Sequence, residues 1–350
     1  MQTVMILCGG ESSEHEVSLQ SANSIIQHIP RDKYEVIPVA INKNGDWVTG
    51  EPLFKNDDDP SNIALADDLT QVRLEKGMLA GKKIDAVFPI IHGTYGEDGC
   101  LQGLLKLQHV PFVGADVLGS AVGMDKDIMK RLLVPLGIKC ARHRVIYIWQ
   151  NDKPSYEEVS GELGEILFVK PCNLGSSVGI SKCRNKEEYD RAVEYALSFD
   201  KKIIVEEFVK GQEVEISALG NETVEVSATG EIIPGEEFYS YDSKYIDSDQ
   251  TQLKIPADIP PNVEEELKAT AIKAFKALEL EGLTRVDFFV KENGEVWLNE
   301  VNTLPGFTKI SMYPKLWEYS GVPYPELIHR LIQLAIDRHK LDSGLSRNKV

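Results

Sequence analysis

The chain has 350 residues, of which 42% are hydrophobic and 27% are charged, so it is long enough for two or three domains with large cores. This composition excludes a disordered or fibrous protein. The formal net charge of −17 argues against a nucleic-acid-binding surface, because such binding depends on lysine and arginine side chains that neutralise phosphates. A ligand that carries phosphate must therefore meet a local group of basic residues.

Two features of the sequence bear on its cellular location. No apolar run is long enough to cross a membrane, and the short run Val4–Cys8 lacks the basic flank and cleavage site of a signal peptide. The five cysteines include no C-x-x-C pair, which favours reduced thiols over disulfides or a zinc site. We therefore expect a cytoplasmic protein that binds neither membranes nor nucleic acid.

The chain opens with a predicted strand, turn and helix. Residues 3–8 are apolar and end in Gly9-Gly10. The S-x-x-E pattern of Ser13 and Glu16 predicts a capping box that starts a helix reaching about Ile26. This unit is typical of the start of a doubly wound α/β domain, and its turn is suited to binding a small anion or a ligand backbone.

Two further strands are predicted before the first domain ends. They cover residues 34–41 and 86–91, and His92 follows the second one directly. This order favours a parallel sheet with functional loops at the carboxyl ends of its strands. Small residues dominate positions 114–123, where we place a domain boundary ahead of a helix that begins near Lys126.

A glycine-containing segment follows the predicted strand 166–170. It carries two glycines, the hydroxyls of Ser176 and Ser177, and an adjacent lysine, Lys170. These are the parts that let backbone amides close over phosphates, although the G-x-x-x-x-G-K-[ST] pattern is missing. An ordinary β-turn is the alternative. A polar helix over 186–197 and a strand over 203–209 come next.

Residues 235–249 form a polar segment with several aromatic residues and no periodicity. Long loops of this kind are uncommon unless they act as lids or are disordered. A lid that closes over a phosphoryl-transfer site would exclude water from a reactive intermediate. A plain surface loop is the alternative.

A hairpin is predicted after a long amphipathic helix over 263–278. Asn293-Gly294 is a strong signal for a two-residue turn between two alternating apolar runs. Counting back from this turn gives the register of the whole ladder. It pairs Glu292 with Glu295, Asp287 with Glu300, and Arg285 with Asn302.

This register places two carboxylates directly opposite each other. Like charges opposed across strands are destabilising, and Arg285, Asp287, Glu300 and Asn302 would share one face of the hairpin. Two carboxylates and an amide oxygen are hard ligands that suit Mg²⁺ bound together with substrate phosphates. A solvated polar face, partly neutralised by Arg285, is the alternative. A final amphipathic helix is expected over 325–336, followed by a polar end.

Five segments, taken together and in order, resemble the signatures of D-alanine–D-alanine ligases, which are members of the ATP-grasp superfamily. They are Gly9–Ser18, His92–Gly99, Lys170–Gly179, Tyr241–Tyr245 and Asn299–Gly306. The resemblance extends over essentially the whole chain. It implies an α/β, three-domain ATP-grasp architecture with an N-terminal doubly wound parallel-sheet domain, and ATP held between the other two domains.

The same resemblance implies domain limits. An N-terminal substrate domain would cover 1–117, a central ATP-grasp subdomain 118–205, and a C-terminal domain with the lid and metal site 206–340, with a polar tail over 341–350.

In this family, ATP phosphorylates the carboxylate of one D-alanine, and the amine of a second attacks the acyl phosphate. The products are D-alanyl-D-alanine for peptidoglycan precursors, ADP and phosphate, and the enzymes are usually homodimers. Tyr245 favours the dipeptide, because relatives that make D-alanyl-D-lactate differ at this position. The main alternative is another acceptor, such as D-serine or D-lactate. A non-catalytic nucleotide-binding regulator would be expected to lack Arg285, Glu300 or Asn302, and all three are present.

The resemblance also assigns site residues. Asp287, Glu300 and Asn302 match the ligands of two Mg²⁺ ions, for which Mn²⁺ is a possible substitute, and Arg285 and the Gly306 amide match oxyanion-stabilising donors. The residues that match ATP contacts are Lys126, Lys170, Ser177, Glu206, Phe208, Val209, Glu213 and the lid residue Lys244. The residues that match amino-acid contacts are Glu14, Ser176 and Tyr245 for the first substrate, with His92, Ser311 and Met312 as further contacts.

Overall fold

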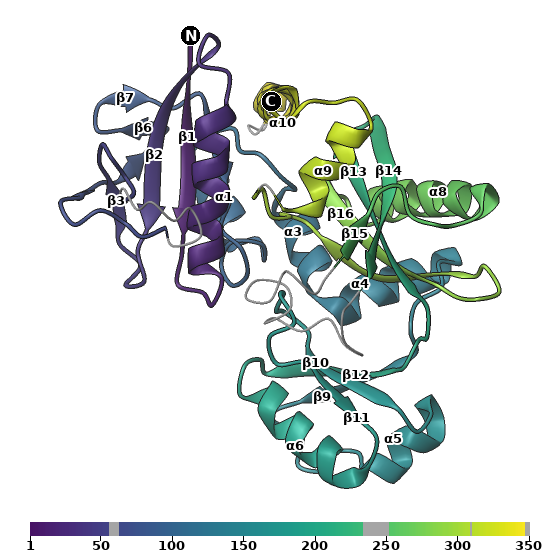
Figure 1. Ribbon diagram of the computed structural model, residues 1–350. Coiled ribbons are helices and arrows are strands. Elements are labelled where there is room, and N and C mark those ends of the chain that lie inside the picture. Colours follow the sequence, from purple (N-terminus) through teal and green to yellow (C-terminus); the bar gives the residue numbers. More distant parts are fainter. Residues whose placement is uncertain (56–62, 234–251, 309, 347–350) are drawn as a thin grey trace.

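The computed structural model of the protein describes residues 1–55, 63–233, 252–308 and 310–346. The predicted lid over 235–249, with Lys244 and Tyr245, lies outside these residues. The fold contains three larger sheets, each with helices packed against it (Figure 1). None of the helices in the described ranges is both long and apolar enough to span a membrane.

The N-terminal sheet has the strand order β4-β3-β2-β1-β8. Its parallel centre consists of β1 (Gln2–Gly9), β2 (Tyr34–Ile41) and β8 (Ala86–Pro89), and two short antiparallel strands, β3 (Trp47–Thr49) and β4 (Thr70–Gln71), extend one edge. The predicted parallel sheet is therefore confirmed. A small separate sheet contains β5 (Leu74–Glu75), β6 (Met78–Leu79) and β7 (Lys82–Lys83), and α2 (Cys100–Leu107) follows it.

The first helix, α1 (His15–His28), packs against β1 but begins differently from the prediction. Its N-cap is Glu14, with no side-chain capping bond, and Glu16 pairs with Lys43 at 2.5 Å. The predicted capping box of Ser13 and Glu16 is therefore wrong. The helix starts later because the Ser12 hydroxyl accepts a hydrogen bond of 3.2 Å from the Glu14 amide. This start leaves Glu14 at the tip of the helix, where it is buried.

The central sheet is antiparallel, with the order β11-β10-β12-β9. Its strands are β9 (His143–Tyr147), β10 (Leu167–Pro171), β11 (Ser181–Cys183) and β12 (Lys202–Glu207). Helices α5 (Tyr156–Leu163) and α6 (Lys186–Leu197) cover one face, as Figure 1 shows, and α6 has the predicted bounds. The core between them contains Val159, Tyr189 and Val205, so this unit has a hydrophobic centre of its own.

The third sheet is antiparallel, with the order β15-β14-β13-β16-β17. Its strands are β13 (Gln212–Gly220), β14 (Val224–Ile233), β15 (Gln252–Lys254), β16 (Gly282–Val290) and β17 (Val296–Asn302). Helix α8 (Pro261–Ala277) buries its apolar stripe against one face, where Leu267 and Phe275 share a core with Val286 and Phe288. Helix α9 (Met312–Tyr319) packs on β13 and β14. Helix α3 (Val117–Met124) packs against β17, and helix α4 (Lys126–Leu133) packs against α8.

The β16–β17 hairpin has the predicted register at the acids but not at the turn. Val290 pairs with Val296, and the Lys291 amide bonds to the Glu295 carbonyl at 2.9 Å, so the turn contains three residues. The predicted pair of Glu292 with Glu295 is therefore wrong. Gly294 adopts a φ of 81° in this turn, which is the left-handed conformation that closes a three-residue loop.

A bulge at Asn299 then corrects the register by one residue. Phe288 pairs with Leu298, whereas Asp287 pairs with Glu300. The bulge forms where the Leu298 amide bonds to the Lys139 carbonyl at 2.8 Å, outside the hairpin. The predicted pairs of Asp287 with Glu300 and of Arg285 with Asn302 are confirmed.

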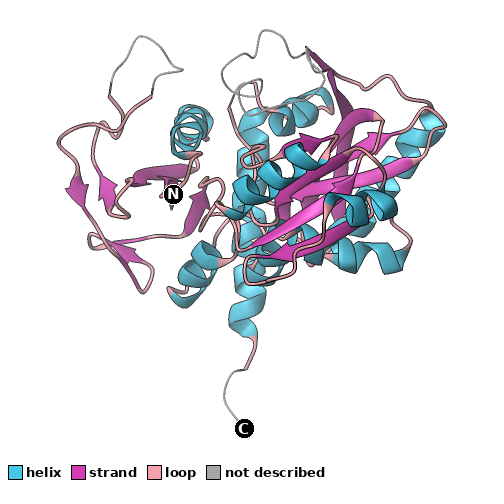
Figure 2. Cartoon of the chain, turned by 90° about the horizontal axis from the view of Figure 1, so that it is seen from below, coloured by secondary structure: helices cyan, strands magenta, loops and turns pink. Residues whose placement is uncertain are grey.

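The last helix, α10 (Tyr324–Gly344), is longer than predicted. The polar tail was expected from residue 341, but the helix continues to Gly344. Beyond residue 336 it is held by Arg338, which donates to the Phe112 carbonyl at 2.7 Å and pairs with Glu281 at 3.1 Å. Seen from below in Figure 2, α10 runs between the N-terminal sheet and the other sheets, and it contacts both β8 and β16.

Candidate active site

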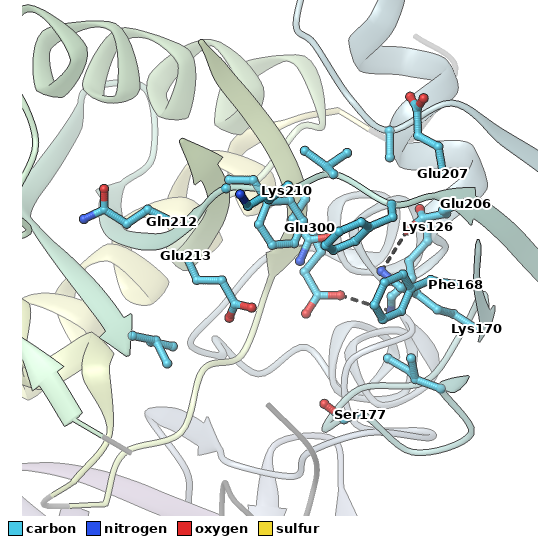
Figure 3. Close-up of a pocket in the computed structure, with 18 of the residues that line it drawn as sticks. Lys126, Phe168, Lys170, Ser177, Glu206, Glu207, Lys210, Gln212, Glu213 and Glu300 are labelled. Carbon is cyan, nitrogen blue, oxygen red and sulfur yellow. Dashed lines mark ion pairs between the residues drawn. The ribbon is translucent and has the colours of Figure 1, made fainter. Parts of the chain in front are cut away.

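A cavity of about 360 Å³ lies between the central and third sheets (Figure 3). Side chains from β10, β12, β13, β14 and β17 line it together with the 174–180 loop. All seven of the predicted ATP contacts that fall within the described ranges are among the lining residues. They are Lys126, Lys170, Ser177, Glu206, Phe208, Val209 and Glu213. The eighth, Lys244, lies outside the described residues.

Lys126 is the first residue of α4 and is buried at the edge of the cavity. The Asp125 carboxylate caps the helix by accepting hydrogen bonds from the amides of Asp127 and Ile128, each 3.1 Å long. The Lys126 ammonium donates to the Leu174 carbonyl at 2.7 Å and lies 3.4 Å from Glu300. This lysine therefore joins the glycine-containing loop to the acidic hairpin.

Glu206 lies between two lysines at the wall of the cavity, close to Lys126 (Figure 3). Its two carboxylate oxygens are 2.7 Å from the ammonium groups of Lys130 and Lys170, respectively. Burial raises the pKa of Glu206, but Lys130 and Lys170 oppose it, and the net result is a pKa well below the ordinary value. Sequence reasoning missed Lys130, although it lies one helical turn after Lys126, beside the buried Met129.

The loop before β11 contains a β-turn of an uncommon kind, with both central residues in the left-handed region. Ser176 and Ser177 have φ values of 52° and 60°, which are uncommon for residues other than glycine. Strained backbone of this kind is concentrated at functional sites. The Val178 amide bonds to the Gly175 carbonyl at 3.1 Å, and both serines face the cavity.

The loop also meets the N-terminal sheet. The Ser176 hydroxyl donates to the carboxylate of Glu14, which is buried. Glu97 is buried nearby and accepts the Gly93 amide at 2.8 Å. Burial, and then the charge of Glu14, raises the pKa of Glu97 to about 8. Sequence reasoning missed Glu97 as a site residue, although it lies within the His92–Gly99 motif.

His92 is buried where the N-terminal sheet meets the segment after β17. Its Nδ1 lies 3.1 Å from the Leu304 carbonyl, and its Nε2 lies 3.4 Å from the Ser21 hydroxyl. Burial lowers the pKa of His92, so the ring is held neutral at physiological pH. The contact with Leu304 brings this histidine to the chain that leads to Gly306.

Gly306 and Ser311 lie side by side. A Cβ added to Gly306 would be 3.0 Å from the Ser311 hydroxyl, which bonds to the Thr308 amide at 3.0 Å. Met312, in contrast, is buried with Ile232 and Leu316 in a hydrophobic cluster. The described structure therefore brings Gly306 and Ser311 together but places the Met312 side chain among apolar neighbours.

Three carboxylates form a row across the third sheet. In the strand register, Glu215 on β13 lies opposite Asp287 on β16, and Asp287 lies opposite Glu300 on β17. Arg285 lies 3.1 Å from Glu215 and donates to both Asp287 oxygens at 2.8 and 2.7 Å. Burial lowers the pKa of Arg285, but Asp287 and Glu215 outweigh it and raise the pKa well above its ordinary value.

The hairpin bulge adds a neighbour to this row. Because Asn299 is the extra residue, it lines the cavity together with Glu300, its successor in sequence. Sequence reasoning missed Asn299 because a bulge cannot be read from alternation alone. It also missed Glu215, which could have been found from its spacing of two residues from Glu213 on one strand.

The chemistry of this row fits a divalent cation. The charges of Arg285 and Lys126 leave the three carboxylates with an excess of negative charge, and their oxygens are hard donors. Within the part of the chain that the structure describes, no three acidic, histidine or cysteine side chains already form a ligand cluster. Both oxygens of Asp287 accept hydrogen bonds from Arg285 instead.

Known proteins resemble this chain along its whole length. Models described as D-ala D-ala ligase N-terminus and C-terminus match residues 3–115 and 132–333. A D-alanine–D-alanine ligase of Shouchella clausii is 48% identical over 355 residues, which cover 98% of this chain and 96% of that protein.

Solved structures of D-alanine–D-alanine ligases have the same fold as this chain. The D-alanine–D-alanine ligase from Coxiella burnetii has a TM-score of 0.84 and 35% identity, and the match covers 98% of this chain and 97% of that one. The Bacillus anthracis enzyme complexed with ATP has a TM-score of 0.77 and 26% identity, covering 98% and 100%. The predicted ATP-grasp α/β architecture is thus confirmed. The chain belongs to the D-alanine–D-alanine ligase family.

Proposed function

We propose that this protein joins two D-alanine molecules to D-alanyl-D-alanine in an ATP-dependent reaction that passes through an acyl phosphate. One observation carries the proposal. Ser176 lines the cavity that contains the predicted ATP contacts, and its hydroxyl donates to the buried Glu14 carboxylate of the N-terminal domain. The loop that lines the cavity is therefore in direct contact with a group that can bind a substrate ammonium.

In the first step, the chain must bring a carboxylate substrate to the transferred phosphoryl group. Glu14 would bind the ammonium of the first D-alanine, and the fixed Ser176 hydroxyl sets the orientation of the Glu14 carboxylate. Lys126 and Lys170, which both line the cavity, would supply positive charge to the nucleotide phosphates. This is catalysis by positioning and electrostatics, as is usual for phosphoryl transfer.

Asp287, Glu300 and Asn302 would hold the Mg²⁺ ions, or Mn²⁺ in their place. When bound, these ions neutralise phosphate charge during transfer. The support from this chain is the row of hard oxygen donors and the excess of negative charge that remains after Arg285 and Lys126 are counted.

In the second step, negative charge develops on the oxygen of the attacked carbonyl. The Arg285 guanidinium and the Gly306 amide are the proposed donors to that oxygen. Ser311, beside Gly306, would bind the carboxylate of the second D-alanine. The roles of Lys244 and Tyr245 remain predictions, because both residues lie outside the described ranges.

The nucleotide base is assigned to the aromatic part of the cavity. Phe208 and Val209, which follow β12, line the cavity, and Phe168 lies beside Phe208 with ring centroids 5.9 Å apart. Glu213 on β13 also lines the cavity. Aromatic and apolar surface of this kind suits a planar base. The ATP complex of the B. anthracis relative, which has the same fold, supports ATP as the nucleotide.

The domain limits 1–117, 118–205 and 206–340 are part of the proposal. They are supported by the separate core of the central sheet and by the change from the parallel N-terminal sheet to antiparallel sheets. A homodimer in the cytoplasm, serving peptidoglycan precursor synthesis, remains a prediction from the family resemblance.

The test is ADP release by the purified protein with Mg²⁺ and one amino or hydroxy acid at a time. We expect D-alanine to stimulate release strongly, and L-alanine, D-serine and D-lactate to do so weakly or not at all. Release that D-alanine does not stimulate would overturn the proposal. A preference for D-serine or D-lactate as acceptor beside D-alanine would replace it by the corresponding mixed ligase.

A further inference from the structure

Among the site lysines in the described ranges, Lys130 differs from Lys126 and Lys170 because it does not line the cavity. Its side chain is fully buried, and Glu206 is its one ion-pair partner among the described residues. Lys170, which binds the other oxygen of Glu206, lines the cavity and keeps 11% of its side chain exposed. Figure 3 shows Lys170 and Glu206 joined at the cavity wall.

The two lysines therefore differ in what they can do when a nucleotide enters. Lys170 can turn its ammonium toward a phosphate, because it lies at the surface of the cavity. Lys130 cannot leave Glu206 without burying an unpaired ammonium, which is strongly unfavourable. Glu206 thus has one exchangeable partner and one permanent partner.

Resting on the proposed function, we propose that Lys130 is a positioning residue for ATP. It remains paired with Glu206 so that Lys170 can be released to the nucleotide phosphates. Without Lys130, Lys170 would be the sole counter-ion of a buried carboxylate. Release of Lys170 would then leave Glu206 unpaired, so Glu206 and the phosphates would compete for one ammonium.

The prediction concerns ATP and not D-alanine, which separates it from a purely structural role. Glu14, the proposed ammonium ligand, belongs to the N-terminal domain and accepts a hydrogen bond from Ser176, which is not part of this lysine pair. A general loss of packing around α4 would disturb both substrates. A loss of nucleotide positioning would raise the KM for ATP and leave the KM for D-alanine nearly unchanged.

The experiment is calorimetric titration of the full-length protein with ADP in the presence of Mg²⁺, together with KM values for both substrates. We expect Lys130→Met to weaken ADP binding by about tenfold or more, with the KM for D-alanine within about twofold of wild type. Lys130→Arg should restore most of the affinity, because it keeps a buried cation. Arg338→Met is the control, since it removes a buried cation far from the cavity and should leave ADP affinity unchanged.

A double-mutant cycle with Glu206→Gln provides the second measurement. If Lys130 acts through Glu206, then Lys130→Met added to Glu206→Gln should change ADP affinity by less than about twofold. This comparison does not need the single Lys130→Met variant to fold, because the double variant carries neither the buried lysine nor its carboxylate partner.

Three results would overturn the inference: unchanged ADP affinity in Lys130→Met, equal changes in both KM values, or additive effects in the cycle. Failure of the proposed function would look different. In that case wild type would show no D-alanine-dependent ADP release, and the binding cycle would still decide the role of Lys130.

Discussion

The acids of the site differ in what faces each carboxylate. Glu206 lies between Lys130 and Lys170, and Asp287 accepts two bonds from Arg285. Glu97 is different, because it accepts a hydrogen bond from the Gly93 amide and its strongest charged neighbour is the acidic Glu14. Burial and repulsion by the Glu14 charge both disfavour the ionised form of Glu97, so its carboxyl group keeps its proton to a higher pH. Ionisation of Glu97 should therefore lower the stability of the folded protein.

We predict that Glu97→Gln flattens the pH dependence of stability. Burial raises the pKa of Glu97 from 4.5 to about 8, so between these pH values the folded protein holds a proton that the unfolded chain has released. Its contribution to stability is complete below pH 4.5 and is lost as the pH rises to about 8. Urea unfolding across this range should show a decline for wild type and a smaller decline for the glutamine variant. Parallel curves for the two proteins would contradict the assignment.

A second prediction concerns the metal ligands. Glu300→Gln should lower kcat/KM by at least about tenfold and raise the Mg²⁺ concentration needed for half-maximal rate, because one charged hard donor is lost. The measurement is a Mg²⁺ titration of the initial rate. Glu295→Gln is the matched control, since Glu295 lies on the same hairpin but pairs with Lys139 outside the cavity. If both variants gave the same titration, Glu300 would not be a ligand.

At the level of elements, the hairpin shows which parts of a site can be derived from sequence. The Asn-Gly turn signal located the hairpin, and alternation placed Asp287 and Glu300 on one face. The turn length and the bulge were not derivable, because the bulge depends on a bond between Leu298 and Lys139, which are distant in sequence. The turn is one residue longer than predicted, and the bulge at Asn299 shifts the register back by one residue. The predicted pairing of Asp287 with Glu300 is therefore correct.

The same distinction applies to the helices and to the site. The helix over 186–197 and the helix after 263 were predicted because apolar periodicity is a local property. Lys130 and Glu215 were missed because their importance comes from partners on other elements. The start of α1 was wrong for a similar reason, since the Ser12 hydroxyl both accepts the Glu14 amide and donates to the His92 carbonyl at 2.9 Å.

The hairpin turn supports a prediction at this scale. Gly294→Ala should destabilise the protein by about 1 kcal/mol, because an alanine is strained at the observed φ of 81°. Gly161, exposed within α5, has no atom within 4 Å of an added Cβ and no left-handed φ, so Gly161→Ala should stabilise by about 0.5–1 kcal/mol. Denaturant midpoints measure both. Shifts of the same sign in both variants would show that the turn geometry does not govern the effect.

For the molecule as a whole, α10 connects the N-terminal sheet to the ATP-binding part. It packs on β8 and on β16, and Tyr324 near its start bonds to the Phe307 carbonyl at 2.7 Å, close to Gly306. At its other end, Arg338 donates to the carbonyls of Phe112 and Gly114, in the segment that leads out of the N-terminal sheet. One helix thus holds both the linker, which is the segment around residues 112–114, and the segment after β17.

Arg338→Met should therefore lower the free energy of unfolding by about 2–4 kcal/mol, because two buried carbonyls and Glu281 lose their donor. The catalytic rate at low temperature should remain close to wild type, since Arg338 lies outside the cavity. Arg330→Met is the matched control on the same helix. Its side chain is 39% exposed and pairs with Glu326 at 3.2 Å, so a loss within about 0.5 kcal/mol is expected. Equal losses in the two variants, measured by urea unfolding, would mean that α10 is held by its apolar face alone and that Arg338 does not tie the linker to it.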